Sequence, residues 1–288
     1  MKHDNRMPRT RPATDADLRE DRSGMSRRSF GKAVLATTAG FLLPHNSFAL
    51  NQEAASGPTP SGATNIVLVH GAFADGSSWS RVIPLLEAKG FNVSAVQNPL
   101  TSLADDVATT RRLLAKQTGP TILVGHSYAG IVITEAGNEP NVTGVVYISS
   151  YGPAEGQSHD DLVKSFPPAS GISNIHLDAD GFLLIARDKF HETFADDVDA
   201  PQARIMAAVQ KPLAKKCFGA PVGVPAWKSK PSWFLISTND RLINPDLQRF
   251  MAKRMGATTT LVPSSHASLV SHPTEVANLI TEAAGHRA

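Results

Sequence analysis

The sequence predicts an α/β domain with a mostly parallel sheet of about six strands and helices on both faces. Short apolar runs rich in β-branched residues alternate with longer segments of helical periodicity, as in successive βαβ units. Small and polar residues gather directly after several of these runs, where the carboxyl ends of parallel strands would meet. With 288 residues, of which 41% are hydrophobic, the chain can bury one good-sized core.

Strands are expected where apolar runs end in turn residues. These runs are 66–69, 92–96, 121–125, 144–148, 232–237 and 258–262. Helices are expected between them, where apolar residues recur at i, i+3, i+4 and i+7. The first helix is marked by Trp79, Val82, Ile83 and Leu86, and the others are 103–115, 128–136, 245–255 and 273–284.

The most informative segment is Gly-His-Ser-Tyr-Ala-Gly at 125–130, which follows a predicted strand. A strand that runs into a Gly-x-Ser-x-small turn, with a helix behind it, is typical of a nucleophile elbow. Such a turn strains the backbone of its serine, here Ser127, and exposes the hydroxyl at the end of the sheet. The last position of the pattern is Ala129 instead of glycine, which keeps that side chain small. We therefore predict that Ser127 is a nucleophile.

A serine nucleophile needs a base to take its proton and a carboxylate to orient that base. In folds with this elbow the acid and then the histidine follow the serine along the chain. Asp240 comes just after the predicted strand 232–237, and His266 comes just after 258–262. Both lie on loops at strand ends, so we predict a catalytic triad of Ser127, Asp240 and His266.

Other acids and histidines compete for these roles. Asp246 falls in the first turn of a predicted helix, where a negative charge favours the helix dipole, and is expected to be structural. His272 stands at the start of the last predicted helix and is expected to be a boundary residue. His126 directly precedes Ser127, so its side chain should diverge from the serine and pack nearby.

Acyl transfer also needs an oxyanion hole of two backbone N–H groups. One donor is expected from the residue after the nucleophile, Tyr128. The other is expected from His-Gly-Ala-Phe at 70–73, the loop that follows the first predicted strand. Ala72 or Phe73 should supply it, and Ala72 is favoured because the glycine before it lets the backbone turn toward the substrate.

With these motifs the chain resembles the α/β-hydrolase superfamily, and within it the small cap-bearing esterase and hydroxynitrile-lyase-like branch. The resemblance spans roughly 65–284, and the segments 72–79 and 271–273 also look like that branch. It implies the α/β-hydrolase fold with a helical cap and the triad and oxyanion donors named above. The reaction of such a triad needs no cofactor. The fold alone does not define the substrate.

A stretch of about 80 residues, Tyr151 to Lys230, interrupts the alternation of strands and helices. It is too long for an ordinary connection and should have structure of its own. In the resembled branch this position carries the cap, so a cap insertion is expected over about 152–230. Its helices are predicted near 158–165, 181–196 and 201–209. Most of its apolar residues should form a small core, and the few that face Ser127 would define an apolar pocket.

Residues 1–49 are predicted to be a signal peptide of the twin-arginine type. Arg27 and Arg28 precede an apolar run, 33–43, and a small-x-small site that ends at Ala49. The run is about half the ~20 residues needed to span a bilayer, so no stable membrane anchor is expected after cleavage. The prediction is a periplasmic or secreted protein that uses the twin-arginine export machinery.

The rest of the chain is expected to form a linker, 50–63, and a hydrolase domain, 64–288. Residues 1–49 hold 9 of the 28 Lys/Arg and 5 of the 26 Asp/Glu, which leaves 19 cations and 21 anions elsewhere. A mature part that is slightly acidic implies no nucleic-acid partner. The single cysteine, Cys217, cannot form an internal disulfide, and no spacing suggests a metal site.

The predicted function is a carboxylesterase of class EC 3.1.1 that cleaves esters of small to medium apolar acyl substrates through an acyl-enzyme on Ser127. The same triad would serve a cofactor-free perhydrolase of the haloperoxidase type, or a lactonase. A hydroxynitrile lyase is less favoured, because lyases of the resembled branch hold cyanide with a lysine beside the catalytic histidine and Ala267 follows His266 here. A non-catalytic ligand receptor is disfavoured because all three triad positions are occupied.

Overall fold

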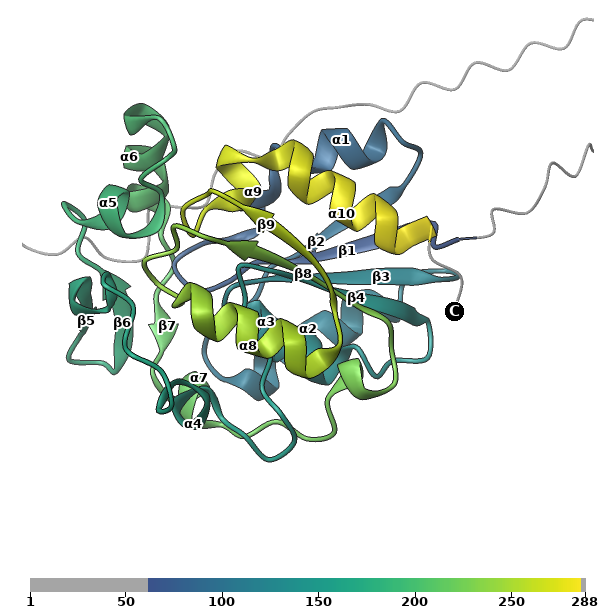
Figure 1. Ribbon diagram of the computed structural model, residues 1–288, viewed down its shortest axis with the longest axis horizontal. Coiled ribbons are helices and arrows are strands. Elements are labelled where there is room, and N and C mark those ends of the chain that lie inside the picture. The colour runs from purple at the N-terminus through teal and green to yellow at the C-terminus, as the bar shows by residue number, and fades with distance from the viewer. Residues whose placement is uncertain (1–61, 286–288) are drawn as a thin grey trace, which may run out of the picture. The chain divides into compact units, whose positions relative to one another are not determined.

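A computed structural model describes residues 62–285, so the predicted signal peptide and nearly all of the predicted linker lie outside the described residues. The described chain has a central six-stranded sheet in which every neighbouring pair of strands is parallel (Figure 1). In spatial order the strands are β2 (Asn92–Val96), β1 (Asn65–Val69), β3 (Thr121–His126), β4 (Val142–Ile148), β8 (Ser232–Ser237) and β9 (Thr258–Val262). The predicted α/β class and its six strands are confirmed.

The central strands are apolar because helices cover both faces of a parallel sheet. Every residue of β1, β3 and β8 is buried, whereas the edge strand β9 is mostly threonine and largely exposed. The register pairs Val69 with Gly125, His126 with Ile148, and Ser237 with Val262. The four strand ends that precede the predicted site loops are therefore in line at one rim of the sheet.

Helices lie on both faces of this sheet (Figure 1). One face carries α2 (Leu103–Leu114), α3 (Ala129–Ala136) and α8 (Pro245–Met255), and the other carries α1 (Ile83–Glu87), α9 (Ser268–Ser271) and α10 (Pro273–Gly285). The single helix predicted around Trp79 to Leu86 is wrong. The chain forms a 3-10 turn, η1 (Gly76–Trp79), and then α1, which begins afresh with Pro84 in its first turn. Within residues 62–285 no helix is both long and apolar enough to cross a membrane.

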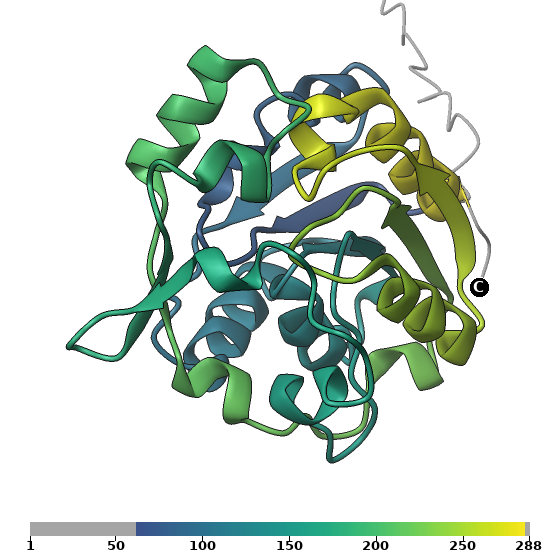
Figure 2. The same cartoon turned by 60° about the vertical axis from the view of Figure 1, so that its left-hand side comes forward.

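The segment between β4 and β8 forms a cap beside the sheet (Figures 1 and 2). Its helical elements are α4 (His159–Val163), η2 (Ile172–Asn174), α5 (Phe190–Phe194), α6 (Ala200–Val209), α7 (Lys216–Gly219) and η3 (Ala226–Lys228). It also contains an antiparallel sheet of β5 (Ile175–Leu177), β6 (Phe182–Ile185) and β7 (Leu213–Ala214).

The helix predicted over 181–196 is wrong in its first half, which is strand β6. The cause is the turn before it. Asp178 accepts hydrogen bonds from the N–H groups of Asp180 and Phe182, and Gly181 has a φ of 84°. This turn folds β5 back on β6, and an apolar run such as 182–185 fits a strand as well as a helix once a hairpin pairs it.

Candidate active site

Ser127 lies in the turn between β3 and α3, with a φ of 57°. Its carbonyl accepts hydrogen bonds from the N–H of Gly130, the N–H of Tyr151 and the hydroxyl of Ser150. A side chain at Gly130 would meet Ser150 Oγ and the Tyr151 carbonyl oxygen at 2.0 Å, so glycine is needed there. The turn therefore holds the serine in the left-handed region that non-glycine residues rarely adopt.

Asp240 and His266 form a buried pair at the ends of β8 and β9. His266 Nδ1 lies 2.8 Å from Asp240 Oδ2, and their side chains are 1% and 0% exposed. Because a carboxylate only accepts, Nδ1 carries the proton and the imidazole lone pair is at Nε2. His266 Nε2 is buried and has no hydrogen-bond partner among the described residues, so its lone pair is free to accept a proton.

The elbow and the histidine loop meet through His126. His126 Nε2 lies 2.9 Å from the carbonyl oxygen of His266, and the two rings have their centroids 4.8 Å apart. The carbonyl requires Nε2 to be the protonated nitrogen, and burial holds the pKa of His126 well below its usual value. The neutral imidazole of His126, the residue before Ser127, is thus hydrogen-bonded to the backbone of the candidate base.

The loop after β1 packs directly against the serine. A side chain at Gly71 would come within 2.7 Å of Ser127 Cβ and 2.8 Å of the His126 carbonyl oxygen. The N–H of Phe73 donates to the carbonyl of Lys211 in the cap at 3.1 Å, whereas the described residues contain no backbone acceptor for the N–H of Ala72. Of the two predicted alternatives, Ala72 is therefore the one with a donor available for an oxyanion.

The buried side chains of His70 and Asn98 hold the same loop in place through hydrogen bonds. His70 Nε2 accepts the N–H of Asn98 at 2.9 Å, so its Nδ1 donates to the Gly71 carbonyl at 2.9 Å. Asn98 returns a hydrogen bond to the His70 carbonyl at 3.1 Å. Burial lowers the pKa of His70 to about 4, which keeps the ring neutral near pH 7. The orientation of Gly71 therefore depends on a neutral histidine.

Tyr128, the other predicted oxyanion donor, is anchored by its side chain. Its hydroxyl donates to Asp106 Oδ2 at 2.8 Å, and Asp106 Oδ1 accepts the N–H of Leu100 at 2.8 Å. Burial raises the pKa of Asp106 to about 6, and burial together with this carboxylate raises the pKa of Tyr128. The backbone N–H of Tyr128 has no backbone acceptor in the described part of the chain.

The competing residues lie in other environments. His272 Nδ1 is 2.9 Å from Ser271 Oγ and 3.6 Å from Asp197, and it makes no bond to Asp240. Asp246 pairs with Arg249 on the exposed side of α8 at 3.0 Å. Neither reaches the buried Asp240–His266 pair.

Gln248 is a residue of the site that the sequence prediction missed. It lies on α8, is fully buried, and donates from Nε2 to Asp240 Oδ2 at 2.8 Å. A signal was present in the sequence. Gln248 falls on the same helical face as the apolar Met251, Ala252 and Met255, where a polar residue calls for a buried partner.

The cap closes over the histidine. The ring of Phe194 meets the His266 ring edge-on, with centroids 4.9 Å apart. Asp197 accepts the N–H of Ser265 at 2.9 Å, and Ser265 Oγ donates to the Phe194 carbonyl at 3.3 Å. Ser127 itself is 7% exposed, so little water reaches the site.

A cavity of about 280 Å³ lies between the cap and the acid loop. Tyr151, whose N–H donates to the Ser127 carbonyl, forms part of its wall. Leu242 and Ile243, whose N–H groups donate to Asp240, form another part. The remaining lining residues are mainly apolar and come from the cap and from the start of α8. The cavity is therefore walled by residues that hydrogen-bond to two members of the candidate triad.

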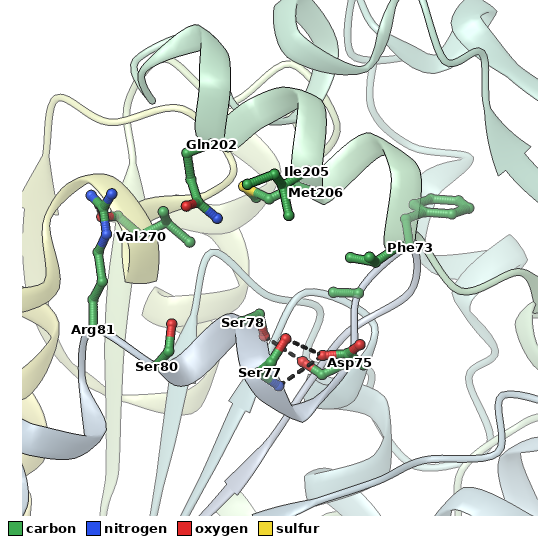
Figure 3. A pocket seen from close by; sticks show the side chains of 12 residues that line it. Phe73, Asp75, Ser77, Ser78, Ser80, Arg81, Gln202, Ile205, Met206 and Val270 are labelled. Atoms are coloured by element: carbon green, nitrogen blue, oxygen red, sulfur yellow. Dashed lines mark hydrogen bonds between the residues drawn. The ribbon is translucent and has the colours of Figure 1, made fainter.

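A smaller cavity, of about 70 Å³, lies between α6 and the segment that follows the oxyanion loop. Gln202, Ile205 and Met206 extend from α6 toward Ser78 and Val270 on its opposite side (Figure 3). Within residues 62–285 no group of three His, Cys, Asp or Glu side chains is arranged to hold a metal ion.

Comparison with known proteins gives the same picture of the fold. A family model described as the alpha/beta hydrolase family matches residues 66–279. The pyrethroid hydrolase of Sphingobium wenxiniae is 28% identical over 251 residues, a match that covers 76% of this chain and 87% of that protein. The alpha/beta hydrolase nvfD of Aspergillus novofumigatus is 24% identical over 243 residues, which cover 76% and 96% of the two chains.

Solved structures are similar over the same region. A pyrethroid hydrolase from Sphingobium faniae has a TM-score of 0.67 at 23% identity, over 77% of this chain and 97% of its own. Polyneuridine aldehyde esterase has a TM-score of 0.66 at 16% identity, over 76% and 98%. At such identities the likeness concerns the fold alone. Because the family model matches most of the sequence, the chain belongs to the alpha/beta hydrolase family.

Proposed function

We propose that this protein is a serine esterase that cleaves carboxylic esters through an acyl-enzyme on Ser127. The observation that carries the proposal is a serine with a φ of 57° whose neighbour His126 hydrogen-bonds to the carbonyl of His266, the residue that forms a buried pair with Asp240 at 2.8 Å. A serine in that conformation costs free energy, and folds retain such strain where it has a use. The names of two similar proteins, a pyrethroid hydrolase and polyneuridine aldehyde esterase, support the same reaction class.

In the proposed reaction His266 Nε2 takes the proton of Ser127 Oγ as that oxygen attacks the ester carbonyl. Asp240 keeps the imidazole proton on Nδ1 and stabilises the imidazolium that forms. The N–H groups of Ala72 and Tyr128 donate to the oxyanion of the tetrahedral intermediate. His266 then protonates the leaving alcohol. Water, activated by the same histidine, releases the acyl group and restores the serine.

The cavity of about 280 Å³ supports an apolar substrate of small to medium size. Its wall includes Tyr151, Leu242 and Ile243, which contact Ser127 and Asp240 through their backbone. Ser127 and His266 are not among its lining residues, so the acyl or the alcohol part of the ester would extend from Ser127 into this cavity. Apolar lining favours hydrocarbon groups over charged ones.

The test is turnover of a panel of p-nitrophenyl esters with acyl chains of increasing length, together with fluorophosphonate labelling. Ser127→Ala should lose on the order of 10⁴–10⁶ in turnover and all labelling while remaining folded. The unsubstituted protein should label at Ser127, as identified by peptide mass. A Ser127→Ala variant with near-normal esterase activity would reject the proposal. Labelling without turnover would favour the ligand-receptor alternative.

We also propose that residues 1–49 direct export through the twin-arginine machinery and that the enzyme works in the periplasm or outside the cell. The paired Arg27 and Arg28, the short apolar run and the small-x-small site support this. Replacing both arginines with lysine should leave the full-length protein in the cytoplasmic fraction, whereas the unsubstituted protein should be processed and exported. Equal export of both forms would contradict the proposal.

A further inference from the structure

We propose that Gln248 is a positioning residue of the reaction, which orients Asp240 and, through it, the imidazole of His266. The inference rests on the proposed function. Gln248 is fully buried on α8, eight residues after Asp240, and its amide joins the acid to the end of strand β8.

Both polar atoms of the Gln248 amide have hydrogen-bond partners. Its Oε1 accepts the N–H of Ser237 at 3.1 Å, and its Nε2 donates to Asp240 Oδ2 at 2.8 Å and to the Ile243 carbonyl at 3.0 Å. These partners define which end of the amide is oxygen. Rotating the amide by half a turn would direct an N–H at the N–H of Ser237 and an oxygen at a carboxylate. The side chain therefore has one orientation.

The carboxylate of Asp240 is held by a complete set of donors. Oδ1 accepts the N–H groups of Leu242 at 2.8 Å and Ile243 at 3.0 Å. Oδ2 accepts Gln248 Nε2 and His266 Nδ1, each at 2.8 Å. The backbone donors hold one oxygen, so Gln248 is the only residue besides His266 among these partners that holds the other. Without it, Oδ2 could move away from the line to Nδ1.

The anchor of Gln248 explains how it can hold an acid on a loop. Ser237 is the last residue of β8, and the backbone N–H of Gln248 donates to the carbonyl of Asn244, the N-cap of α8. Through the side chain of Gln248, the carboxylate of Asp240 is therefore held against both the central sheet and helix α8. Rigid elements hold a catalytic geometry better than a loop alone can.

Two substitutions separate this role from simple packing. Gln248→Met keeps the length of the side chain and removes all its hydrogen bonds. Gln248→Glu keeps an acceptor for the Ser237 N–H but places a carboxylate against Asp240. If donation to Asp240 matters, the glutamate variant should lose at least as much activity as the methionine variant, and urea unfolding of both variants separates this loss from general destabilisation.

A matched control is Gln210→Met. Gln210 also uses its amide to accept a backbone N–H and donate to a backbone carbonyl, both of Ile185, but it lies in the cap away from Asp240. We expect Gln248→Met to lower kcat for p-nitrophenyl acetate by about 10–100-fold with KM within about twofold, the size typical of partners that orient a site residue. Gln210→Met should leave kcat within about twofold.

Two readouts do not need ester turnover. The rate of fluorophosphonate labelling at Ser127 should fall in Gln248→Met in proportion to kcat. In proton NMR, the far-downfield His266 Nδ1–H signal should shift or broaden in both Gln248 variants and not in Gln210→Met. In the unsubstituted protein this signal should show a through-space cross-peak to the Gln248 side-chain amide, because both N–H groups donate to the same oxygen, Asp240 Oδ2.

The outcomes are distinct. Absence of esterase activity in the unsubstituted protein would reject the proposed function, while labelling and NMR would still test Gln248. Normal kcat and an unchanged Nδ1–H signal in Gln248→Met, or normal kcat in Gln248→Glu, would overturn the inference. If both variants fail to fold, the cross-peak decides: its presence supports the contact with the His266–Asp240 pair, and its absence overturns it.

Discussion

The two halves of the candidate site are held in different ways. The serine half, Ser127 with the loop at 70–73, depends on backbone conformation: a positive φ and glycines where any side chain would collide. The acid–histidine half depends on a buried network centred on the Asp240 side chain, which accepts two hydrogen bonds from backbone N–H groups and two from the side chains of Gln248 and His266. A short sequence motif can determine a backbone conformation, whereas a network of side-chain hydrogen bonds joins residues that are far apart in the sequence.

This contrast predicts where substitutions should lower activity in steps and where a single substitution should lower it sharply. In the acid–histidine half, the hydrogen bonds that Gln248 and His266 donate to Asp240 can be removed separately by substitution. In the serine half, an added methyl group moves the backbone that carries both the nucleophile and the oxyanion donors. His126 is the link between the halves, since it precedes the serine and holds the carbonyl of His266.

The largest effect is expected at the base itself. His266→Ala should reduce kcat by about 10⁴–10⁶, because no other described side chain bonds to Asp240 in a way that could replace the imidazole. His272→Ala is the matched control and should cost less than about twofold, since its ring bonds to Ser271 at 2.9 Å. Kinetics with a p-nitrophenyl ester measure both. A crippled His272→Ala beside an active His266→Ala would move the base to His272.

Gly71→Ala tests the serine half. The new methyl group would lie 2.8 Å from the His126 carbonyl oxygen and 2.7 Å from Ser127 Cβ, so the loop must shift and carry the Ala72 N–H away from the oxyanion. We expect kcat to fall by about 10²–10³, as when one oxyanion donor is lost, with little change in KM.

The control for this substitution is Gly219→Ala. Its new methyl group would meet nothing closer than Asp160 Oδ2 at 4.0 Å, and the position has no positive φ. Kinetics and thermal unfolding of both variants should separate a local shift of the oxyanion loop from general destabilisation. Equal kcat for the two variants would show that Ala72 is not the donor.

Acid should lower the stability of the folded protein through its buried histidines, of which His70 and His126 flank the serine half. The pKa of His70 is about 4 in the folded protein against 6.5 in the unfolded chain, so the unfolded state binds the extra proton between these values. Its contribution is complete above pH 6.5 and falls by up to about 3 kcal/mol as the pH drops toward 4. The pKa values of His126 and His159 are lowered too, so they act in the same direction.

Asp106 opposes this trend. Its pKa of about 6 exceeds the usual 3.8, so the folded state takes up its proton first and gains stability as the pH falls from 6 to 3.8. Urea unfolding at pH 7 and pH 5 should therefore show lower stability at pH 5, and the fall should be steeper in Asp106→Asn. Equal stability at both values in that variant would contradict the assignment of neutral buried histidines.

Local patterns in the sequence were enough for much of this molecule. The six strands and α8 were predicted within a residue or two because each apolar run is bounded by turn residues, and Ser127, Asp240 and His266 were selected because each follows a strand. Strand β6 was missed because four consecutive apolar residues show neither helical nor strand periodicity. Only the turn that pairs them with β5 makes them a strand. Gln248 was missed because its partners, Ser237 and Asp240, become neighbours only when α8 packs on β8.

The smallest effect should come from Ala129→Gly, which supplies the glycine usual in the elbow pattern. Ala129 is fully buried in the first turn of α3, and its methyl group is accommodated without displacing Ser127. Glycine would add flexibility to that turn and lower the free energy of unfolding by about 0.5–1 kcal/mol. kcat should stay within about twofold, because the three hydrogen bonds to the Ser127 carbonyl come from Gly130, Tyr151 and Ser150 and not from this position. Thermal unfolding and ester kinetics measure both, and a tenfold change in kcat would mean that the methyl group itself helps to place the nucleophile.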